Sequence, residues 1–233
     1  QILRDEGVLD PDGTVSRRVR LEGNEHGQPT TLVWEGTVTD PARQEQSGSA
    51  SLTLHPVLFY VGLRVGTTYL DVSERREMPV DVITLDPAGA PVGGKEVTVE
   101  LVRQQWNSVR EVGADGRLRW RSEMTEEIVG RQRVSPGEGR MARISLPVAD
   151  GGAYVVRATA TDVRGNAVRT DAFFYAAGGG YTAWERADDD RIELVPEKTA
   201  YAPGETARLL VQSPFESATA LVTVEREGVI FSR

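Results

Sequence analysis

Residues 95–103 read KEVTVELVR, and this stretch decides the fold class. Its apolar side chains recur at every second position, which is the spacing that places side chains on one face of a strand. The same pattern returns in residues 80–85 (VDVITL) and 154–160 (YVVRATA). A helical period is not sustained over a dozen residues anywhere, and residues 122–129 (SEMTEEIV) could form one helical turn at most. The sequence therefore predicts an all-β protein built from short strands of the sandwich type.

The chain also repeats itself. Residues 32–44 (LVWEGTVTDPARQ) align with residues 154–166 (YVVRATATDVRGN), and residues 95–103 align with residues 220–228 (ALVTVEREG). Both pairs are offset by roughly 120 residues, which is the size of one two-sheet domain rather than of a solenoid repeat. We therefore expect tandem β-sandwich domains.

The phase of the repeat predicts where the domains begin and end. Residues 1–55 carry features of the second half of a repeat, residues 56–178 carry both halves, and residues 191–233 carry only the first half. Residues 179–190 are small and acidic and indicate a linker. We expect a segment of a longer array, in which the two partial domains are ordered only by partnering with each other, with another copy or with flanking chain.

For the complete domain, we predict one seven-strand-type sandwich from residue 58 to about residue 176. Its core should contain the apolar residues that alternate along the strands, since alternation of this kind requires one buried face. These residues are Val80, Val82, Val97, Val99, Leu101, Ile144, Leu146, Val155 and Ala158.

Composition excludes several classes of protein. The chain has 27 Lys and Arg against 35 Asp and Glu, a formal net charge of −8, which disfavours nucleic acid as a partner. It has no cysteine, so a disulfide framework, a thiolate metal site and a cysteine nucleophile are excluded within it. Its apolar runs are far shorter than the roughly 20 residues that cross a bilayer, so we expect no membrane span in this segment.

Catalytic and metal-binding chemistry is not expected either. His26 and His55 are the two histidines and are assigned to different repeats, so a two-histidine metal site cannot be built within one domain. A serine triad is not expected, because the nearest serines have no Gly-x-Ser-x-Gly context. The run Asp188-Asp189-Asp190 is contiguous, unlike a calcium loop, and indicates a solvated linker. The glutamates of residues 122–130 indicate an exposed hairpin or helical turn rather than a glycosidase carboxylate pair. We therefore predict no catalytic residue, no cofactor and no metal site.

Tryptophans and one tyrosine give the candidate contact residues. Trp34, Trp106 and Trp120 fall in predicted strands, where packing in a core is the expected role, and the last two flank a predicted hairpin around residues 114–116. Exposed on a sandwich, the same rings would suit glycan binding. Trp184 lies in the predicted linker, and we expect it, with Tyr201, at an interdomain contact.

Several motifs resemble one family. Residues 198–233, with Tyr-x-Pro-Gly-Glu from Tyr201, a Ser-Pro-Phe and a closing Val-Glu-Arg, resemble the opening strands of the bait-region macroglobulin domain of bacterial alpha-2-macroglobulins. The middle of the chain is similar to the macroglobulin domain before it, in HPVLFYVGL (55–63), in the stretch 86–110 and in RWRSE (119–123). Residues 38–52 (VTDPARQEQSGSASL) resemble the end of the preceding domain.

The resemblance implies tandem immunoglobulin/fibronectin-like macroglobulin β-sandwich domains. It makes residues 1–55 the C-terminal part of one macroglobulin domain, residues 56–178 a complete domain, and residues 191–233 the N-terminal part of the bait-region domain. The implied role is a structural scaffold in a broad-range protease inhibitor that is triggered by cleavage of its bait region. Because the chain lacks cysteine, the thioester of some family members is not in this portion.

The resemblance also implies partners and a compartment. The partners would be the neighbouring macroglobulin domains and, through the bait region of the parent protein, target proteases. The location would be the periplasm, the cell envelope or the medium, with a lipoprotein anchor in some members. The alternative is a cell-surface or periplasmic array of immunoglobulin-like domains for adhesion or glycan binding, which the same strand pattern supports.

Overall fold

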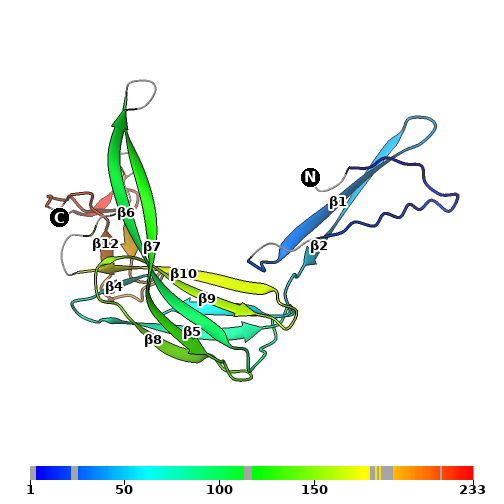
Figure 1. Ribbon diagram of the computed structural model, residues 1–233. Coiled ribbons are helices and arrows are strands. Elements are labelled where there is room, and N and C mark those ends of the chain that lie inside the picture. Colours follow the sequence, from blue (N-terminus) through cyan, green and yellow to red (C-terminus); the bar gives the residue numbers. More distant parts are fainter. Residues whose placement is uncertain are drawn as a thin grey trace. The chain divides into compact units, whose positions relative to one another are not determined.

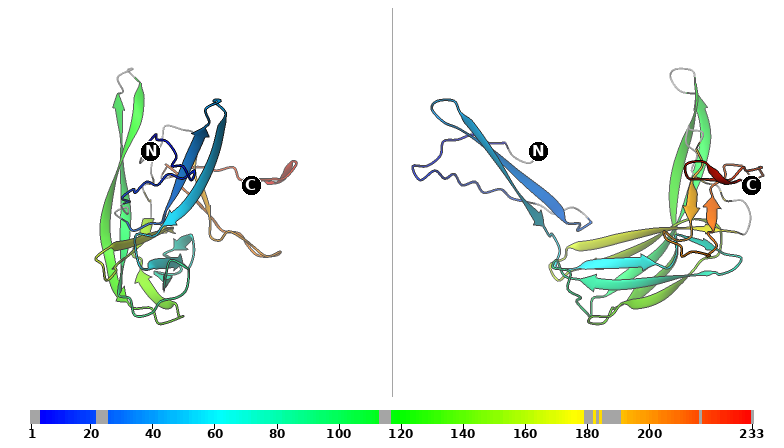
Figure 2. Two further views of the ribbon diagram at one scale, coloured as in Figure 1. Left: turned by 90° about the vertical axis from the view of Figure 1, so that its right-hand side faces the viewer. Right: turned by 180° about the vertical axis from the view of Figure 1, so that it is seen from behind.

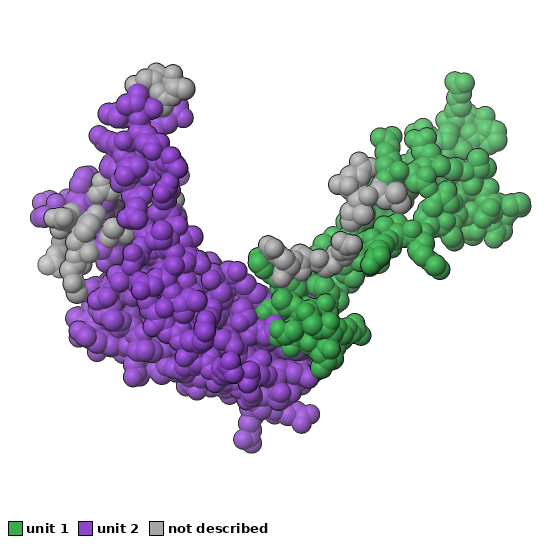
Figure 3. All heavy atoms as spheres, in the orientation of Figure 1, with its two compact units in different colours: residues 1–58, 161–168 green, residues 59–160, 169–233 purple. Residues whose placement is uncertain are grey.

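The computed structural model describes residues 4–21, 26–112, 117–178, 182, 184, 191–215 and 217–232. The described residues form fourteen strands and no helix, which confirms the predicted all-β class (Figure 1). They divide into two compact units, which are coloured separately in Figure 3. Unit 1 contains residues 1–58 and 161–168, and unit 2 contains residues 59–160 and 169–233.

Two sheets form the sandwich of unit 2 (Figure 1). The three-stranded sheet has the order β3–β5–β8, with β3 at Tyr60–Val65, β5 at Glu77–Leu85 and β8 at Ala142–Pro147. The five-stranded sheet has the order β4–β10–β9–β6–β7, with β4 at Tyr69–Asp71, β10 at Ala167–Ala177, β9 at Gly152–Thr161, β6 at Val97–Val112 and β7 at Leu118–Val134.

The first strand of the sandwich passes from one sheet to the other. Its first part, β3, pairs antiparallel with β5, and its second part, β4, pairs parallel with β10. Counted as one divided strand, β3 and β4 bring the sandwich to seven strands, as the sequence predicts. The arrangement is that of an immunoglobulin-like fold.

The predicted core is confirmed apart from Ile144, which is half-buried. Ile144 lies on β8, opposite Val80 of β5. Because β8 is an edge strand of the three-stranded sheet, it has a neighbouring strand on one side only. The other eight predicted core residues are 0–1% exposed. Met78 and Phe174 complete the core at 0% and 1% exposure. Burial of each large apolar side chain stabilises the sandwich by about 1.5–3 kcal/mol.

Four turns of the chain share one hydrogen-bonding pattern. In each of four five-residue turns, the first N–H donates to the carbonyl of the fifth residue, and the fourth N–H donates to the carbonyl of the first. The turns begin at Asp10, Asp40, Asp86 and Asp162. The fourth residue has a positive φ in each, at Gly13 (80°), Arg43 (62°), Gly89 (84°) and Gly165 (84°). Glycine adopts this conformation without a Cβ clash, which explains the Gly-containing turn signals in the sequence.

Unit 1 contains a two-stranded hairpin of β1 (Thr30–Thr39) and β2 (Glu45–Leu54). Leu32 is its single buried side chain, at 9% exposure. Trp34 is 44% exposed and Val33 on the opposite face is 63% exposed. The expectation that Trp34 packs in a core is therefore wrong, because the described part of unit 1 covers neither face of the hairpin with a second sheet.

After the sandwich, two short hairpins follow in unit 2. One joins β11 (Leu194–Pro196) to β12 (Leu209–Val211), and the other joins β13 (Thr223–Glu225) to β14 (Val229–Ser232). The predicted linker at 179–190, with its three aspartates, lies outside the described residues except for Thr182 and Trp184. The boundaries that the repeat predicts for the domains stay predictions.

Candidate functional site

The β6–β7 hairpin extends beyond the sandwich as a ribbon (Figures 1 and 2). β9 pairs with β6 from Thr98 to Gln104, whereas the β6–β7 pairing continues to Val112 and Leu118. Residues 105–112 and 118–125 are therefore a two-stranded ribbon that lacks the support of β9. The predicted hairpin is confirmed, although its turn at residues 114–116 lies outside the described residues.

One face of this ribbon carries two half-buried tryptophans. Trp106 lies opposite Met124, and Arg110 lies opposite Trp120, so alternation places these four side chains on the same face. The Arg110 guanidinium stacks over the Trp120 ring at 5.0 Å from its centroid. Between the two pairs, the hydroxyls of Ser108 and Ser122 are hydrogen-bonded to each other at 2.8 Å.

The opposite face of the ribbon is exposed and charged. Arg121 contacts Glu111 at 3.3 Å and Glu123 at 2.7 Å, and Arg119 lies on the same face. Residues 122–129 therefore belong to a strand, and the alternative of a helical turn is wrong. The two faces differ because only one of them is turned toward other parts of unit 2.

Eight aromatic residues line a hollow of about 750 Å³ in unit 2, here called the aromatic hollow. They are Trp106 and Trp120 of the ribbon, Tyr154 of β9, Phe173, Phe174 and Tyr175 of β10, Trp184, and Phe215. Trp106 and Trp120 are half-buried, so the expectation that they pack in the sandwich core is wrong. They lie on the part of the hairpin that extends beyond β9, where the second sheet does not reach.

The floor of the hollow is well covered. Residues 152–156 of β9 are all buried, although successive side chains of a strand point to opposite faces. Both faces of β9 are therefore covered at this point, one of them by the sandwich core. Trp184 packs edge-on against Tyr175 of β10, with ring centroids 5.7 Å apart and an interplanar angle of 77°, and is 9% exposed.

Gln212 also lines the hollow. Its backbone N–H donates to the carbonyl of Glu193 at 3.0 Å. Its side-chain amide nitrogen is buried and has no hydrogen-bond partner among the described residues. A buried amide donor without a partner costs about 1–3 kcal/mol, so this group is poised to bind an acceptor.

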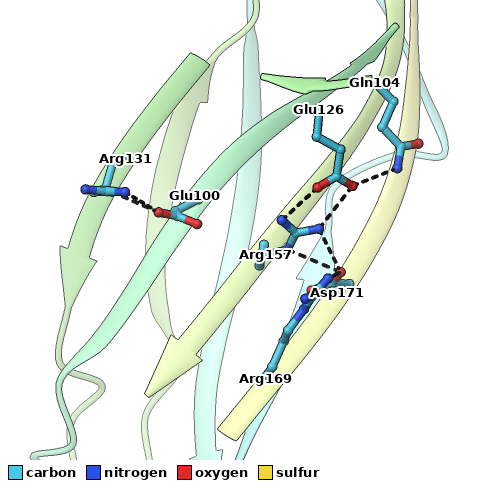
Figure 4. Close-up of polar contacts among 7 residues, drawn as sticks. All are labelled: Glu100, Gln104, Glu126, Arg131, Arg157, Arg169 and Asp171. Atoms are coloured by element: carbon cyan, nitrogen blue, oxygen red, sulfur yellow. Dashed lines mark hydrogen bonds and ion pairs between the residues drawn. The ribbon is translucent and has the colours of Figure 1, made fainter. Parts of the chain in front are cut away.

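A network of ion pairs lies on the five-stranded sheet where the ribbon begins (Figure 4). Arg157 of β9 contacts Glu126 of β7 at 3.0 Å and Asp171 of β10 at 3.5 Å. Gln104 donates to Glu126 at 3.2 Å, and Arg169 contacts Asp171 at 2.6 Å. The network joins four neighbouring strands, β10, β9, β6 and β7, by their side chains.

The same contacts shift the acidity of the carboxyls. The hydrogen bond from Arg157 lowers the pKa of Glu126. Burial raises the pKa of Asp171, but the hydrogen bond from Arg169 and the charge of Arg157 outweigh it, so that the pKa lies below its ordinary value. Both carboxyls are therefore ionised at neutral pH, and we find no pair poised for acid–base chemistry among the residues of this network.

A second contact surface joins residues 196–208 to the sandwich, and we call it the joint. The Thr67 hydroxyl and the Thr68 N–H donate to the carbonyl of Glu197 at 3.0 and 3.3 Å. The Thr68 hydroxyl also donates to the carbonyl of Pro196. Arg208 contacts Glu74 at 2.6 Å.

Of the two predicted contact residues, Trp184 packs on the sandwich and Tyr201 packs within its own turn. The Tyr201 hydroxyl accepts a hydrogen bond from the Lys198 N–H at 3.3 Å, and the Lys198 ammonium lies 4.9 Å from its ring centroid. Its neighbours Glu197 and Arg208 make the contacts of the joint. Whether either residue lies between domains stays a prediction.

Sequence reasoning did not single out Arg110, Arg157, Phe173, Gln212 or Phe215. One signal was available for Phe173, because Phe173 and Phe174 are adjacent on an alternating strand, so one of them must point away from the core. They are 63% and 1% exposed. The other four depend on strand register and on chain crossings that a single sequence does not reveal.

Metal-ligating side chains do not gather in groups of three or more within the described part of the chain. His26 is half-buried and His55 is exposed, both in unit 1. Among the described residues, no helix is long and apolar enough to span a membrane.

Comparisons with known proteins identify the sandwich. The family model described as bacterial macroglobulin domain 6 matches residues 62–178. An alpha-2-macroglobulin homolog of Nostoc sp. (strain PCC 7120) is 24% identical over 232 residues, which cover 100% of this chain and 12% of that protein. The chain thus spans about one eighth of the length of this relative.

Solved structures share the fold. The native conformation of Escherichia coli alpha-2-macroglobulin matches 87% of this chain and 14% of its own, with a TM-score of 0.52 and 18% identity. Salmonella alpha-2-macroglobulin reacted with methylamine matches 89% of this chain and 14% of its own, with a TM-score of 0.50 and 14% identity. With residues 62–178 forming its macroglobulin domain 6, the chain belongs to the bacterial alpha-2-macroglobulin family.

Proposed function

We propose that this chain is a structural scaffold segment of a broad-range protease inhibitor, in which cleavage of a bait region triggers trapping of the protease. The match of a bacterial macroglobulin domain to residues 62–178 carries the proposal. A relative that aligns with the whole chain is named as an alpha-2-macroglobulin homolog, which supports it.

The joint supports a mechanical role. Three of its hydrogen bonds end on backbone carbonyls of Pro196 and Glu197, and such bonds hold a segment in place more firmly than contacts between flexible side chains. A segment held in this way moves with the sandwich as a rigid body, which is how cleavage at a distance is converted into a domain movement. We propose that residues 191–233 are the N-terminal part of the bait-region domain, and that Trp184 and Tyr201 hold it to the preceding domain.

We further propose that the chain has no catalytic activity of its own. The carboxyls of the ion-pair network are held ionised by arginines, and both histidines lie outside unit 2. Its partners would be the neighbouring macroglobulin domains and, through the bait region of the parent protein, target proteases. The parent would act in the periplasm, at the cell envelope or in the medium.

The test is protease inhibition by the protein that contains this chain. Trypsin incubated with the purified parent protein should lose activity on casein. A Thr67→Val/Thr68→Val variant of the joint should inhibit less while its far-UV spectrum is unchanged, and Thr53→Val on an exposed strand of unit 1 should inhibit as the parent does. Undiminished casein hydrolysis with the unmodified parent would refute the proposal.

A glycan array with the same protein tests the alternative of an adhesion module. Binding of an oligosaccharide without protease inhibition would favour that alternative. Protease inhibition without glycan binding is the result that we expect.

A further inference from the structure

We propose that the aromatic hollow is a docking site for an extended acidic peptide that carries an aromatic or proline residue. The hollow of about 750 Å³ falls within the roughly 300–1,000 Å³ typical of ligand sites. The proposal goes beyond the scaffold role, because a scaffold needs no peptide site.

Apolar surface is available for an anchoring side chain. Phe173 is 63% exposed and Phe215 is 65% exposed, and both line the hollow. Aromatic-lined grooves bind proline and aromatic side chains of extended peptides, since such rings bury a large area at a small entropic cost. The anchor of the peptide would lie against these two rings.

Sugar rings fit this surface poorly. Stacking of a sugar requires an open aromatic face. One face of Trp120 is already covered by the Arg110 guanidinium at 5.0 Å, and Trp184 is packed against Tyr175 and 9% exposed. Two of the three tryptophans in the hollow are therefore engaged with protein groups, which favours a peptide over a glycan.

The polar groups of the hollow match a peptide backbone and an acidic side chain. The buried amide of Gln212 is a donor without a partner in the described chain, and a peptide carbonyl would satisfy it. Among the described residues that line the hollow, Arg110 and Arg191 carry a positive charge and Glu193 carries a negative charge. A guanidinium that lies over an aromatic ring can still donate hydrogen bonds from its N–H groups to a carboxylate.

The first experiment identifies a ligand. A random dodecapeptide phage library is panned on the full 233-residue chain. Enrichment of peptides that combine Asp or Glu with Trp, Phe or Pro is the expected result. No enrichment, or enrichment of peptides without acidic residues, would overturn the proposal.

The second experiment locates the site. The affinity of an enriched synthetic peptide is measured by fluorescence anisotropy against the chain and its variants. Arg110→Gln and Gln212→Leu should each weaken binding about tenfold, whereas Arg119→Gln on the opposite face of the ribbon should not change it. Equal affinity for all variants would place the peptide elsewhere and refute the assignment.

Two other occupants are distinguished in the same series. Competition of the peptide by chitohexaose or maltohexaose would show a glycan site. Dimerisation of the chain in sedimentation velocity that Arg110→Gln abolishes would show a second copy in the hollow. Either outcome overturns the peptide proposal without touching the protease-inhibition assay, which is read separately.

Discussion

The Arg157 guanidinium on β9 lies 3.0 Å from the Glu126 carboxylate on β7, at the place where β7 leaves the five-stranded sheet for the ribbon (Figure 4). Beyond this point β9 no longer pairs with β6, so backbone hydrogen bonds from the sheet cease. The ion pair therefore joins β9 to the base of the ribbon at the level where the pairing of β9 with β6 ends. Between the pairs Leu101–Gly130 and Val102–Ile128, β7 contains one extra residue, Val129, so a β-bulge lies on β7 close to the same level, and bulges re-aim a strand.

Replacement of Arg157 by methionine is expected to destabilise unit 2 by about 1–2 kcal/mol. Arg157 is 15% exposed and bridges two carboxylates, so its removal leaves Glu126 and Asp171 without their shared cation. The free energy of unfolding from urea titration measures the effect. Glu111→Gln, which alters an exposed ion pair with Arg121, should cost less than about 0.5 kcal/mol. If the two substitutions lower the free energy of unfolding equally, the Arg157 network stabilises unit 2 no more than an exposed ion pair does.

Asp81 gives a prediction on pH. Its carboxylate, 9% exposed on β5, contacts Arg143 at 2.7 Å and Arg64 at 2.6 Å on the two neighbouring strands. These hydrogen bonds lower its pKa from 3.8 to about 2. Because the folded state favours the charged form, the stabilisation is fully present above pH 3.8 and is lost as pH falls toward 2.

Asp81→Asn should therefore be less stable than the unmodified chain at pH 6 and about equally stable near pH 2. The arginines are exposed, so we expect a difference of about 1–2 kcal/mol at pH 6. Urea midpoints measured from pH 2 to pH 6 check this. A constant difference across that range would mean that Asp81 acts by packing rather than by charge.

Most strands and core residues of the sandwich can be predicted from local sequence patterns, whereas the lining of the aromatic hollow cannot. The strands of the core alternate, and two of the connections between them are turns that begin with aspartate and have glycine at the fourth position, at Asp86 and Asp162. Both signals are contained in a few neighbouring residues. Trp106 and Trp120 alternate in the same way as core residues, and the distance over which β9 supports the hairpin decides that they lie outside the core. That distance depends on register between strands about 50 residues apart, which local patterns do not specify.

The glutamates of β7 illustrate the same limit. Met124 and Ile128 are four residues apart and are both apolar, which is compatible with a helical turn as well as with a strand. Pairing with the whole length of β6 decides in favour of the strand. Glu126 then meets Arg157, a partner 31 residues away that no spacing rule would have selected.

Arg43→Gly is expected to stabilise the β1–β2 hairpin. Arg43 occupies the fourth position of its turn with a φ of 62°, where the other three turns of this type carry glycine. A left-handed conformation costs a residue with a Cβ about 1–2 kcal/mol, and the entropy of glycine offsets part of this, so we expect a gain of about 0.5–1 kcal/mol.

Hydrogen exchange of the hairpin amides measures this local gain directly. Gly89→Ala is the reverse control in the sandwich. Its φ is 84° and no atom lies within 4 Å of the added Cβ, so backbone strain alone should destabilise it. We expect slower hydrogen exchange near residue 43 in Arg43→Gly and faster exchange near residue 89 in Gly89→Ala. Slower exchange in both variants, or in neither, would contradict the argument from the φ angle.

The final prediction concerns the packing of Trp184, which depends on a glycine in the sandwich. A Cβ at Gly151 would lie 2.5 Å from the Thr182 hydroxyl oxygen and 3.0 Å from the carbonyl oxygen of Gly178. Such distances are shorter than van der Waals contact, so Gly151→Ala should displace Gly178 and Thr182 and loosen Trp184 from Tyr175. Acrylamide quenching of tryptophan fluorescence should increase in Gly151→Ala, and the increase should vanish when Trp184 is replaced by phenylalanine in the same chain. Gly130→Ala is the matched control, since its Cβ would meet Leu101 at an ordinary 3.5 Å. Quenching that rises equally in both alanine variants would mean that Gly151 does not control the position of Trp184.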